Sequence, residues 1–185
     1  MAVAARSGAG SLSGLLPRLS RPWSKVLRRD ESLADLLAAL EPLGYAVLHD
    51  VETDGGTADH VVVGPSGVFV IQTRTWRGNV HQATRGRLMC DGKDRSEAVD
   101  HAIAVTAAIG RRLDGIGVRW VNAILAVSDA RVRHPMTFRR VRVTSGRDAV
   151  ALILNAPERL TRPEVARAGS MLARRGLHRL RAQPS

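Results

Sequence analysis

Three polar side chains meet at the open end of a predicted β-hairpin. Two apolar, β-branched segments, 59–63 and 68–74, flank a Gly-Pro-Ser-Gly turn. A turn of two or four residues places Asp59 opposite Gln72, and directly opposed residues have Cβ atoms about 4.5–5.5 Å apart. A carboxylate and an amide oxygen in that position could share one ion. Arg74 lies on the same face, because strand side chains alternate with a period of two, and its guanidinium could pair with Asp59 in the ion's place.

The elements that must position these groups alternate between helices and strands. We expect helices over 31–41, 96–113, 148–154 and 161–175, the hairpin over 58–74, a strand pair over 79–89 that turns at 84–86, and further strands over 45–51, 118–127 and 139–144. Ser96 is the predicted N-cap of the second helix, and Thr161 to Glu164 forms a capping box. This order predicts an α/β fold with a mixed central sheet flanked by helices.

The charge of the chain is unevenly distributed. The net charge is +11 over 185 residues. Residues 1–29 contain six basic and no acidic side chains, residues 30–130 nine and fourteen, and residues 131–185 thirteen and three. Most of the cations are arginine, whose planar guanidinium suits phosphate. The pattern predicts a polyanionic partner for the two ends, although an Arg- and Ala-rich proteome would produce the same bias without a partner.

Composition excludes several classes of protein. A single cysteine, Cys90, rules out an internal disulfide and a cysteine-rich zinc site. The chain lacks a P-loop and a Gly-rich dinucleotide turn, so we expect no small-molecule cofactor. No apolar run approaches the roughly 18 residues of a membrane span, and no secretory apolar region is present. We therefore expect a cytoplasmic protein that does not act in a membrane.

Three segments are predicted along the chain. Residues 1–29 form a flexible basic tail, although their Arg- and Ser-rich, acid-poor composition also fits a transit peptide. Residues 30–155 form the domain that carries the hairpin. Residues 156–185 contain a basic helix that packs on this domain or extends it.

The hairpin sequence resembles a known family. Residues 58–80, with the turn and the Trp76-Arg77-Gly78 that follows the second strand, are similar to the NERD domain, whose name abbreviates nuclease-related domain. Residues 30–34 resemble the start of its first helix. The similarity covers about residues 30–130. It implies the αβββαβ core of restriction-endonuclease-like proteins, because this family is placed in the PD-(D/E)XK nuclease-like superfamily.

The resemblance also implies roles for individual residues. In nucleases of this superfamily, an Asp and the acid of an acid-x-Lys triplet hold a divalent metal, helped by a glutamate from a helix. By resemblance, the metal positions are Asp59, Gln72 and Glu31, the lysine position is Arg74, and the catalytic set is Asp59, Gln72 and Arg74. The metal would be Mg²⁺ or Mn²⁺, which take oxygen ligands and activate a bound water.

Two positions depart from the family pattern. Gln72 offers an oxygen but no charge, so metal affinity should be weaker. Arg74 can replace lysine electrostatically, but it cannot transfer a proton, because its pKa lies above about 12. Three interpretations stay open: an active Mg²⁺- or Mn²⁺-dependent phosphodiesterase, a DNA- or RNA-binding protein with a degenerate site, and a cross-strand pair without chemistry. A non-enzymatic module that docks on a ribonucleoprotein is a further alternative.

Cationic side chains beyond the hairpin are the candidates for phosphate contacts. They are Arg77, His81, Arg131, Arg133, Arg139, Arg140 and Arg142. His60 should face away from Asp59 as a packed or solvated side chain, and Trp76 should cover the hairpin. Cys90 has no histidine near it in sequence and is expected to be inert.

Overall fold

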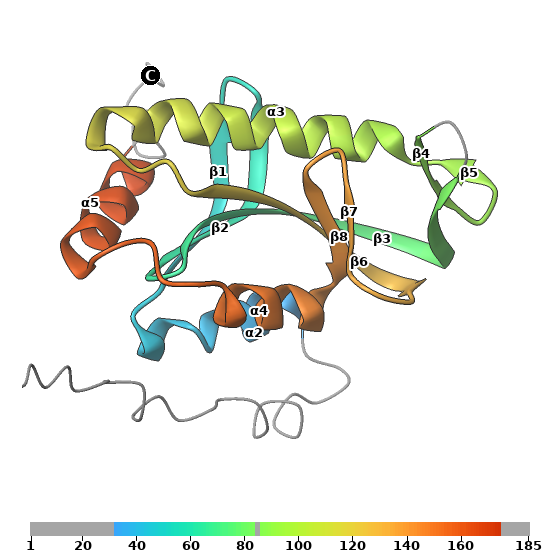
Figure 1. Ribbon diagram of the computed structural model, residues 1–185, viewed down its shortest axis with the longest axis horizontal. Coiled ribbons are helices and arrows are strands. Elements are labelled where there is room, and N and C mark those ends of the chain that lie inside the picture. Colours follow the sequence, from blue (N-terminus) through green and yellow to red (C-terminus); the bar gives the residue numbers. More distant parts are fainter. Residues whose placement is uncertain (1–31, 84–85, 175–185) are drawn as a thin grey trace, which may run out of the picture. The chain divides into compact units, whose positions relative to one another are not determined.

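Strand β3 (Gly67–Ala83) runs through the centre of the sheet and is its longest strand (Figure 1). The computed structural model describes residues 32–83 and 86–174. The order of strands is β1-β2-β3-β6-β8-β7, with β4 paired to the far end of β3 and β5 paired to β4. The remaining strands are β1 (Ala46–Thr53), β2 (Gly56–Gly64), β4 (Arg87–Cys90), β5 (Lys93–Asp94), β6 (Val121–Val132), β7 (Met136–Phe138) and β8 (Val141–Ser145).

The sheet mixes antiparallel and parallel pairs. Strands β1, β2 and β3 are antiparallel neighbours, β3–β6 and β6–β8 are parallel, and β7–β8 is antiparallel. Helices α3 (Ser96–Leu113) and α5 (Arg162–Ala173) cover one face, and α2 (Leu33–Ala38) and α4 (Gly146–Asn155) cover the other (Figure 1). This architecture confirms the predicted α/β fold and agrees with a restriction-endonuclease-like core.

The hairpin has the predicted register. Val63 pairs with Val68, and the ladder between β2 and β3 continues as far as His60 and Ile71. Side chains of β2 and β3 that point toward α3 and α5 are fully buried, among them Val61 and Val70. Residues of β3 at even positions therefore belong to the α3 face, and those at odd positions belong to the face of α2 and α4.

A β-bulge interrupts β3 where the sequence predicted a break. The register between β3 and β6 shifts between Thr75 and Gly78, after which pairing resumes. Gly78 has φ of +107°, a backbone conformation that favours glycine. The strand predicted to begin at residue 79 is thus the continuation of β3. The strand is continuous because its pairing with β6 resumes after the bulge.

Helix ends differ from the predictions in two places. Ser96 is the first residue of α3 and not its N-cap, which is Arg95; the Ser96 Oγ instead accepts a hydrogen bond from the Leu88 amide. The first helix ends at Ala38, earlier than predicted, and a short 3₁₀ helix, η1 (Glu41–Leu43), leads to Gly44 in the left-handed region. The Thr161–Glu164 capping box at the start of α5 is confirmed.

The predicted strand over 139–144 begins later than expected. Arg139 and Arg140 form a two-residue turn between β7 and β8, and both have positive φ, at 46° and 70°. Such turns normally use Asn or Gly at these positions, so the sequence contained no turn signal. A second 3₁₀ helix, η2 (Asp114–Ile116), follows α3.

No helix within residues 32–83 and 86–174 is long and apolar enough to cross a membrane.

Replacing the fully buried Leu125 of β6 with alanine should destabilise the fold by roughly 2–5 kcal/mol, because the cavity left in the core relaxes only partly. Urea unfolding followed by circular dichroism measures this loss. The matched control is Leu43→Ala in η1, where the side chain is 42% exposed and the expected change is under about 0.5 kcal/mol. Equal losses in the two variants would contradict the core described here.

Candidate functional site

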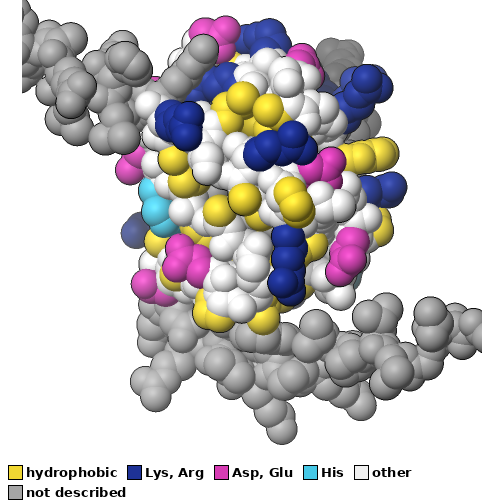
Figure 2. Space-filling model, turned by 90° about the vertical axis from the view of Figure 1, so that its left-hand side faces the viewer, with side chains coloured by type: hydrophobic (Ala, Val, Ile, Leu, Met, Phe, Trp, Pro, Cys, Tyr) yellow, Lys and Arg dark blue, Asp and Glu magenta, His cyan; other side chains and the backbone are white. Residues whose placement is uncertain are grey.

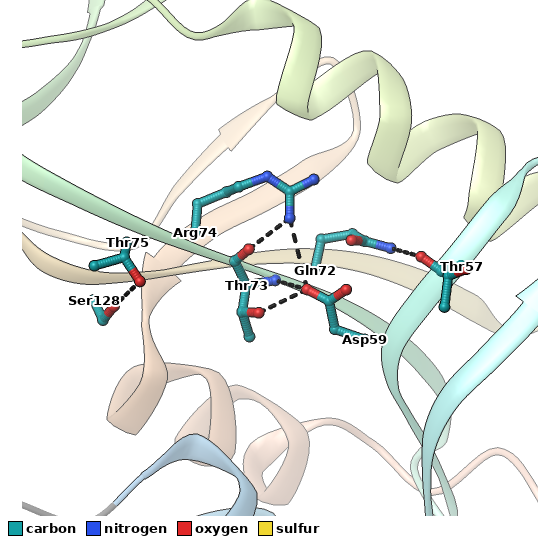
Figure 3. Close-up of polar contacts among 7 residues, drawn as sticks. All are labelled: Thr57, Asp59, Gln72, Thr73, Arg74, Thr75 and Ser128. Carbon is teal, nitrogen blue, oxygen red and sulfur yellow. Dashed lines mark hydrogen bonds and ion pairs between the residues drawn. The ribbon is translucent and has the colours of Figure 1, made fainter.

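Asp59 closes the open end of the β2–β3 hairpin. One carboxylate oxygen, Oδ2, accepts hydrogen bonds from the Thr73 amide at 2.7 Å and from the Thr73 hydroxyl at 2.6 Å (Figure 3). The carboxylate thus takes the place of a backbone acceptor just beyond the last ladder pair. Asp59 lies beside the triplet that the sequence predicted, but its direct partner is Thr73 and not Gln72.

Gln72 is held by the backbone of β2. Its side chain is fully buried, and its Nε2 donates a hydrogen bond to the Thr57 carbonyl at 2.7 Å. The amide oxygen Oε1 is also buried and has no hydrogen-bond partner among the described residues. A carboxylate at this position would place an oxygen against the Thr57 carbonyl oxygen. An amide therefore fits this position better than a carboxylate would.

Arg74 contacts the carboxylate that would hold a metal. Its Nη1 lies 3.6 Å from Asp59 Oδ2 and donates a hydrogen bond to the Thr73 carbonyl. The ion pair is formed through one nitrogen and is not bidentate. The two side chains are 32% and 31% exposed, so solvent weakens the attraction between them.

A cavity of about 430 Å³ lies on the α3 side of the sheet beside Arg74. Trp76, 7% exposed, forms part of its wall, and the guanidinium of Arg95 lies 5.3 Å from the centre of the Trp76 ring. The other lining residues are Asp94, Glu97, Ala98 and His101. Gln72 and Arg74 point toward this face in Figure 3. Arg74 therefore borders a cavity of mixed charge.

Two predicted phosphate contacts on β3 lie on the opposite face. Trp76 and Val80 pack in the cluster beneath α3, so Arg77 and His81, which alternate with them, point to the other side of the sheet. Both are exposed. The structure therefore separates them from the cavity beside Arg74, although they follow it directly in sequence.

The predicted contacts on β6 and β8 follow the same pattern. Val132 packs on the cluster beneath α3, and so do both neighbours of Arg142 in β8. Arg131 and Arg142 therefore point away from α3, and Arg133 follows as the first residue after β6. All three are exposed. Arg142 donates a hydrogen bond to the Thr137 hydroxyl.

The turn arginines have different surroundings. Arg139 forms an ion pair with Asp100 of α3 at 2.8 Å and donates a hydrogen bond to the Gly86 carbonyl. Its guanidinium also lies over the Phe138 ring. Arg140 is exposed and makes no polar contact with the described part of the chain. Arg139 thus fastens the β7–β8 hairpin to α3, whereas Arg140 is available to a partner.

The predicted metal centre lies only partly within the described residues and stays a prediction. No group of three or more His, Cys, Asp or Glu side chains within 32–83 and 86–174 is arranged to hold an ion. Glu31 lies outside the described residues. The remaining donors are the Asp59 carboxylate, which is already engaged by Thr73 and Arg74, and the amide oxygen of Gln72. Mg²⁺ prefers carboxylates and water in an open octahedral site, so this set fits it poorly.

Sequence reasoning missed a histidine pair on the first hairpin. His49 lies opposite His60 in the β1–β2 ladder, and their Nδ1 atoms are 2.7 Å apart. Burial lowers the pKa of His60 below its ordinary value, and the neighbouring His49 lowers it further. His60 is the partner of Ile71 in the β2–β3 ladder, and Asp59 lies just beyond this pair. Knowledge of the β1–β2 register would have been needed to find this pair.

Cys90 agrees with the expectation of an inert thiol. It is buried, and its Sγ donates a hydrogen bond to the Arg77 carbonyl at 3.3 Å. Burial raises the pKa of the thiol, which keeps it in the unreactive protonated form near neutral pH.

Comparison with known proteins gives one match. Residues 26–128, more than half of the chain, match the family model named NERD, nuclease-related domain. No curated protein matches the chain, and neither does any solved structure.

The His49–His60 pair should make stability depend on pH. Because the pKa of His60 is lowered in the folded state, the unfolded chain binds the proton more tightly, and stability falls as pH drops below about 6.5. Urea midpoints at about pH 7.5 and pH 5.5 should differ less in His60→Gln than in the wild type. His81→Gln, which removes an exposed histidine, should retain the wild-type difference. An unchanged difference in His60→Gln would contradict this role.

Proposed function

Because the chain belongs to the NERD (nuclease-related domain) family of the PD-(D/E)XK nuclease-like superfamily, we propose that it binds DNA or RNA without hydrolysing it. Binding, to free nucleic acid or to a ribonucleoprotein, would use its basic surfaces. The site that performs hydrolysis in related nucleases would be degenerate here. The contact between Arg74 and Asp59 is the observation that carries this proposal.

The ion pair competes directly with a metal. A divalent cation bound to Asp59 would lie within a few ångströms of the Arg74 guanidinium, and the two positive charges would repel each other. Arginine keeps its charge at every accessible pH, so the repulsion is not relieved by loss of a proton. Thr73 donates two further hydrogen bonds to the same carboxylate oxygen. Metal binding through Oδ2 would have to displace these three contacts.

The second departure acts in the same direction. Gln72 carries no charge, and its amide nitrogen is committed to the Thr57 carbonyl. Restoring an acid there would break this hydrogen bond and place like partial charges together, which costs about 1–3 kcal/mol for a buried group. The buried surroundings of position 72 thus suit an amide better than a carboxylate. This favours loss of turnover over a metal site that tolerates glutamine.

An active Mg²⁺- or Mn²⁺-dependent phosphodiesterase is the alternative, and one observation favours it. The buried Oε1 of Gln72 accepts no hydrogen bond from any described residue, and an unpaired buried oxygen is a suitable ligand for a hard cation. Glu31 would then have to supply a second carboxylate beside Asp59. In this case the metal would provide an activated water, and Arg74 would stabilise charge on the phosphate.

Cleavage assays with Mg²⁺ or Mn²⁺ test the proposal. The wild-type protein should leave single- and double-stranded DNA and RNA intact, while Gln72→Glu combined with Arg74→Lys should create or raise metal-dependent cleavage if the scaffold keeps a productive geometry. The control variant, Gln82→Glu with Arg87→Lys, makes the same chemical changes at exposed positions and should stay inactive. Circular dichroism confirms that each variant is folded.

Cleavage by the wild-type protein that chelator abolishes, and that Asp59→Ala loses, would overturn the proposal in favour of the phosphodiesterase. If the double variant is folded but inactive, the groove around the site has diverged as well, and the assignment of a binding protein stands.

A further inference from the structure

The excess of positive charge in the described chain lies at one end of the fold. We define the arm as residues 75–83, 86–95 and 128–145, which hold the bulged end of β3 with β4, β5, the end of β6, β7 and β8 (Figure 1). The arm contains nine basic and three acidic side chains, whereas the rest of the described chain contains nine and twelve. On the face over α5, at the other end, basic and acidic side chains are interspersed with apolar ones (Figure 2).

Parallel pairing brings four cationic residues of the arm together. Arg131 of β6 is the partner of Asn79 of β3, between Arg77 and His81 on the same face, and Arg133 follows Arg131 by two residues. We call Arg77, His81, Arg131 and Arg133 the basic ribbon. All four are exposed, and Arg77, His81 and Arg131 lie on the side of the sheet that faces away from α3, whereas Arg133 lies in the bend that follows β6.

The arginines of the basic ribbon have no acidic partners. Elsewhere in the described chain, Arg74, Arg87, Arg111 and Arg139 each pair with an aspartate. The guanidinium groups of Arg77, Arg131 and Arg133 make no ion pair or hydrogen bond with any described residue. Unpaired guanidinium groups on one surface suit an external polyanion.

The aromatic side chains of the arm are not available for stacking on bases. Trp76 and Phe138 are both buried, and each is covered by an arginine, Arg95 and Arg139 respectively. Proteins that bind single strands usually combine a basic groove with exposed aromatic rings, which the described arm lacks apart from its imidazoles. Arg77 and His81 lie about 13 Å apart along β3, close to the width of about 12 Å of the B-form major groove.

The geometry points to the backbone of a nucleic-acid duplex as the ligand of the basic ribbon. This inference rests on the proposed function and names its substrate class and contact surface. A duplex on the ribbon lies on the opposite face of β3 from Gln72 and Arg74, which explains how the chain holds nucleic acid away from the degenerate site. Recognition would be dominated by phosphate and would carry little sequence preference.

Fluorescence anisotropy with a labelled 20-base-pair DNA duplex and its isolated strand tests the inference, using the full chain over a range of salt concentrations. The duplex should bind more tightly than the strand. Arg77→Gln with Arg131→Gln should weaken duplex binding roughly tenfold and reduce the slope of log K against log salt by about 0.9 per lost contact. The control, Arg119→Gln with Arg162→Gln, removes the same charge from exposed positions outside the arm and should stay within about twofold of wild type.

Urea midpoints establish that the variants are folded, and His81→Gln with Arg133→Gln tests the same ribbon through its other two members. Equal losses in the ribbon and control variants, or a single strand that binds as tightly as the duplex, would overturn the inference while nucleic-acid binding itself stands. Absence of binding to both ligands and to their RNA counterparts at low salt would overturn the proposed function with it.

Discussion

The alternation of side chains along β3 is the constraint on which the other features depend. This strand pairs with β2, β4 and β6, so its register is set from both sides. Even positions before the bulge carry Gln72 and Arg74 toward α3, and odd positions carry Thr73 and Thr75 to the opposite face. A shift of one residue would exchange the two sets and bury the wrong one. The location of each polar group therefore follows from one ladder of hydrogen bonds.

The bulge between Thr75 and Gly78 divides β3 into a part that contributes to the candidate site and a part that contributes to the basic ribbon. Before it, β3 lies in the body of the sheet and contributes the triplet beside Asp59. After it, the strand continues into the arm, where Val80 still packs beneath α3 and the polar residues face outward. Bulges bend and twist the strand that contains them. The basic ribbon and the candidate site thus share a strand, although they face opposite sides of the sheet.

Much of the fold could be predicted from the sequence, because it depends on local patterns. The Gly-Pro-Ser-Gly turn and the valines around it determined the register of β2 and β3, and the spacing of apolar residues gave both ends of α3. Elements with weak local signals were missed. The strand β7 has only three residues, and the turn at Arg139 and Arg140 uses residues that disfavour positive φ.

The residues of the candidate site could be predicted from the sequence, but the hydrogen bonds between them could not. The hairpin placed Asp59 near Gln72 and Arg74, and the contact between Arg74 and Asp59 is present. Two hydrogen bonds could not be predicted: the one from Thr73 to the Asp59 carboxylate and the one from the Gln72 amide to the Thr57 carbonyl. Both depend on how β2 and β3 separate beyond His60. Separation of strands is a tertiary effect without a residue-level signature. For the same reason, the division of the arginines between two faces required the register of β6.

The hydrogen bond between Gln72 and Thr57 has a consequence for how this site can change. The buried amide satisfies a main-chain oxygen that no side-chain substitution at position 57 can remove. An acid introduced at position 72 would gain its advantage only with a cation present to neutralise it, and the Arg74 guanidinium beside Asp59 opposes the binding of that cation. The effects of replacing Gln72 and Arg74 should therefore be coupled, because both side chains act on the position that a cation beside Asp59 would take.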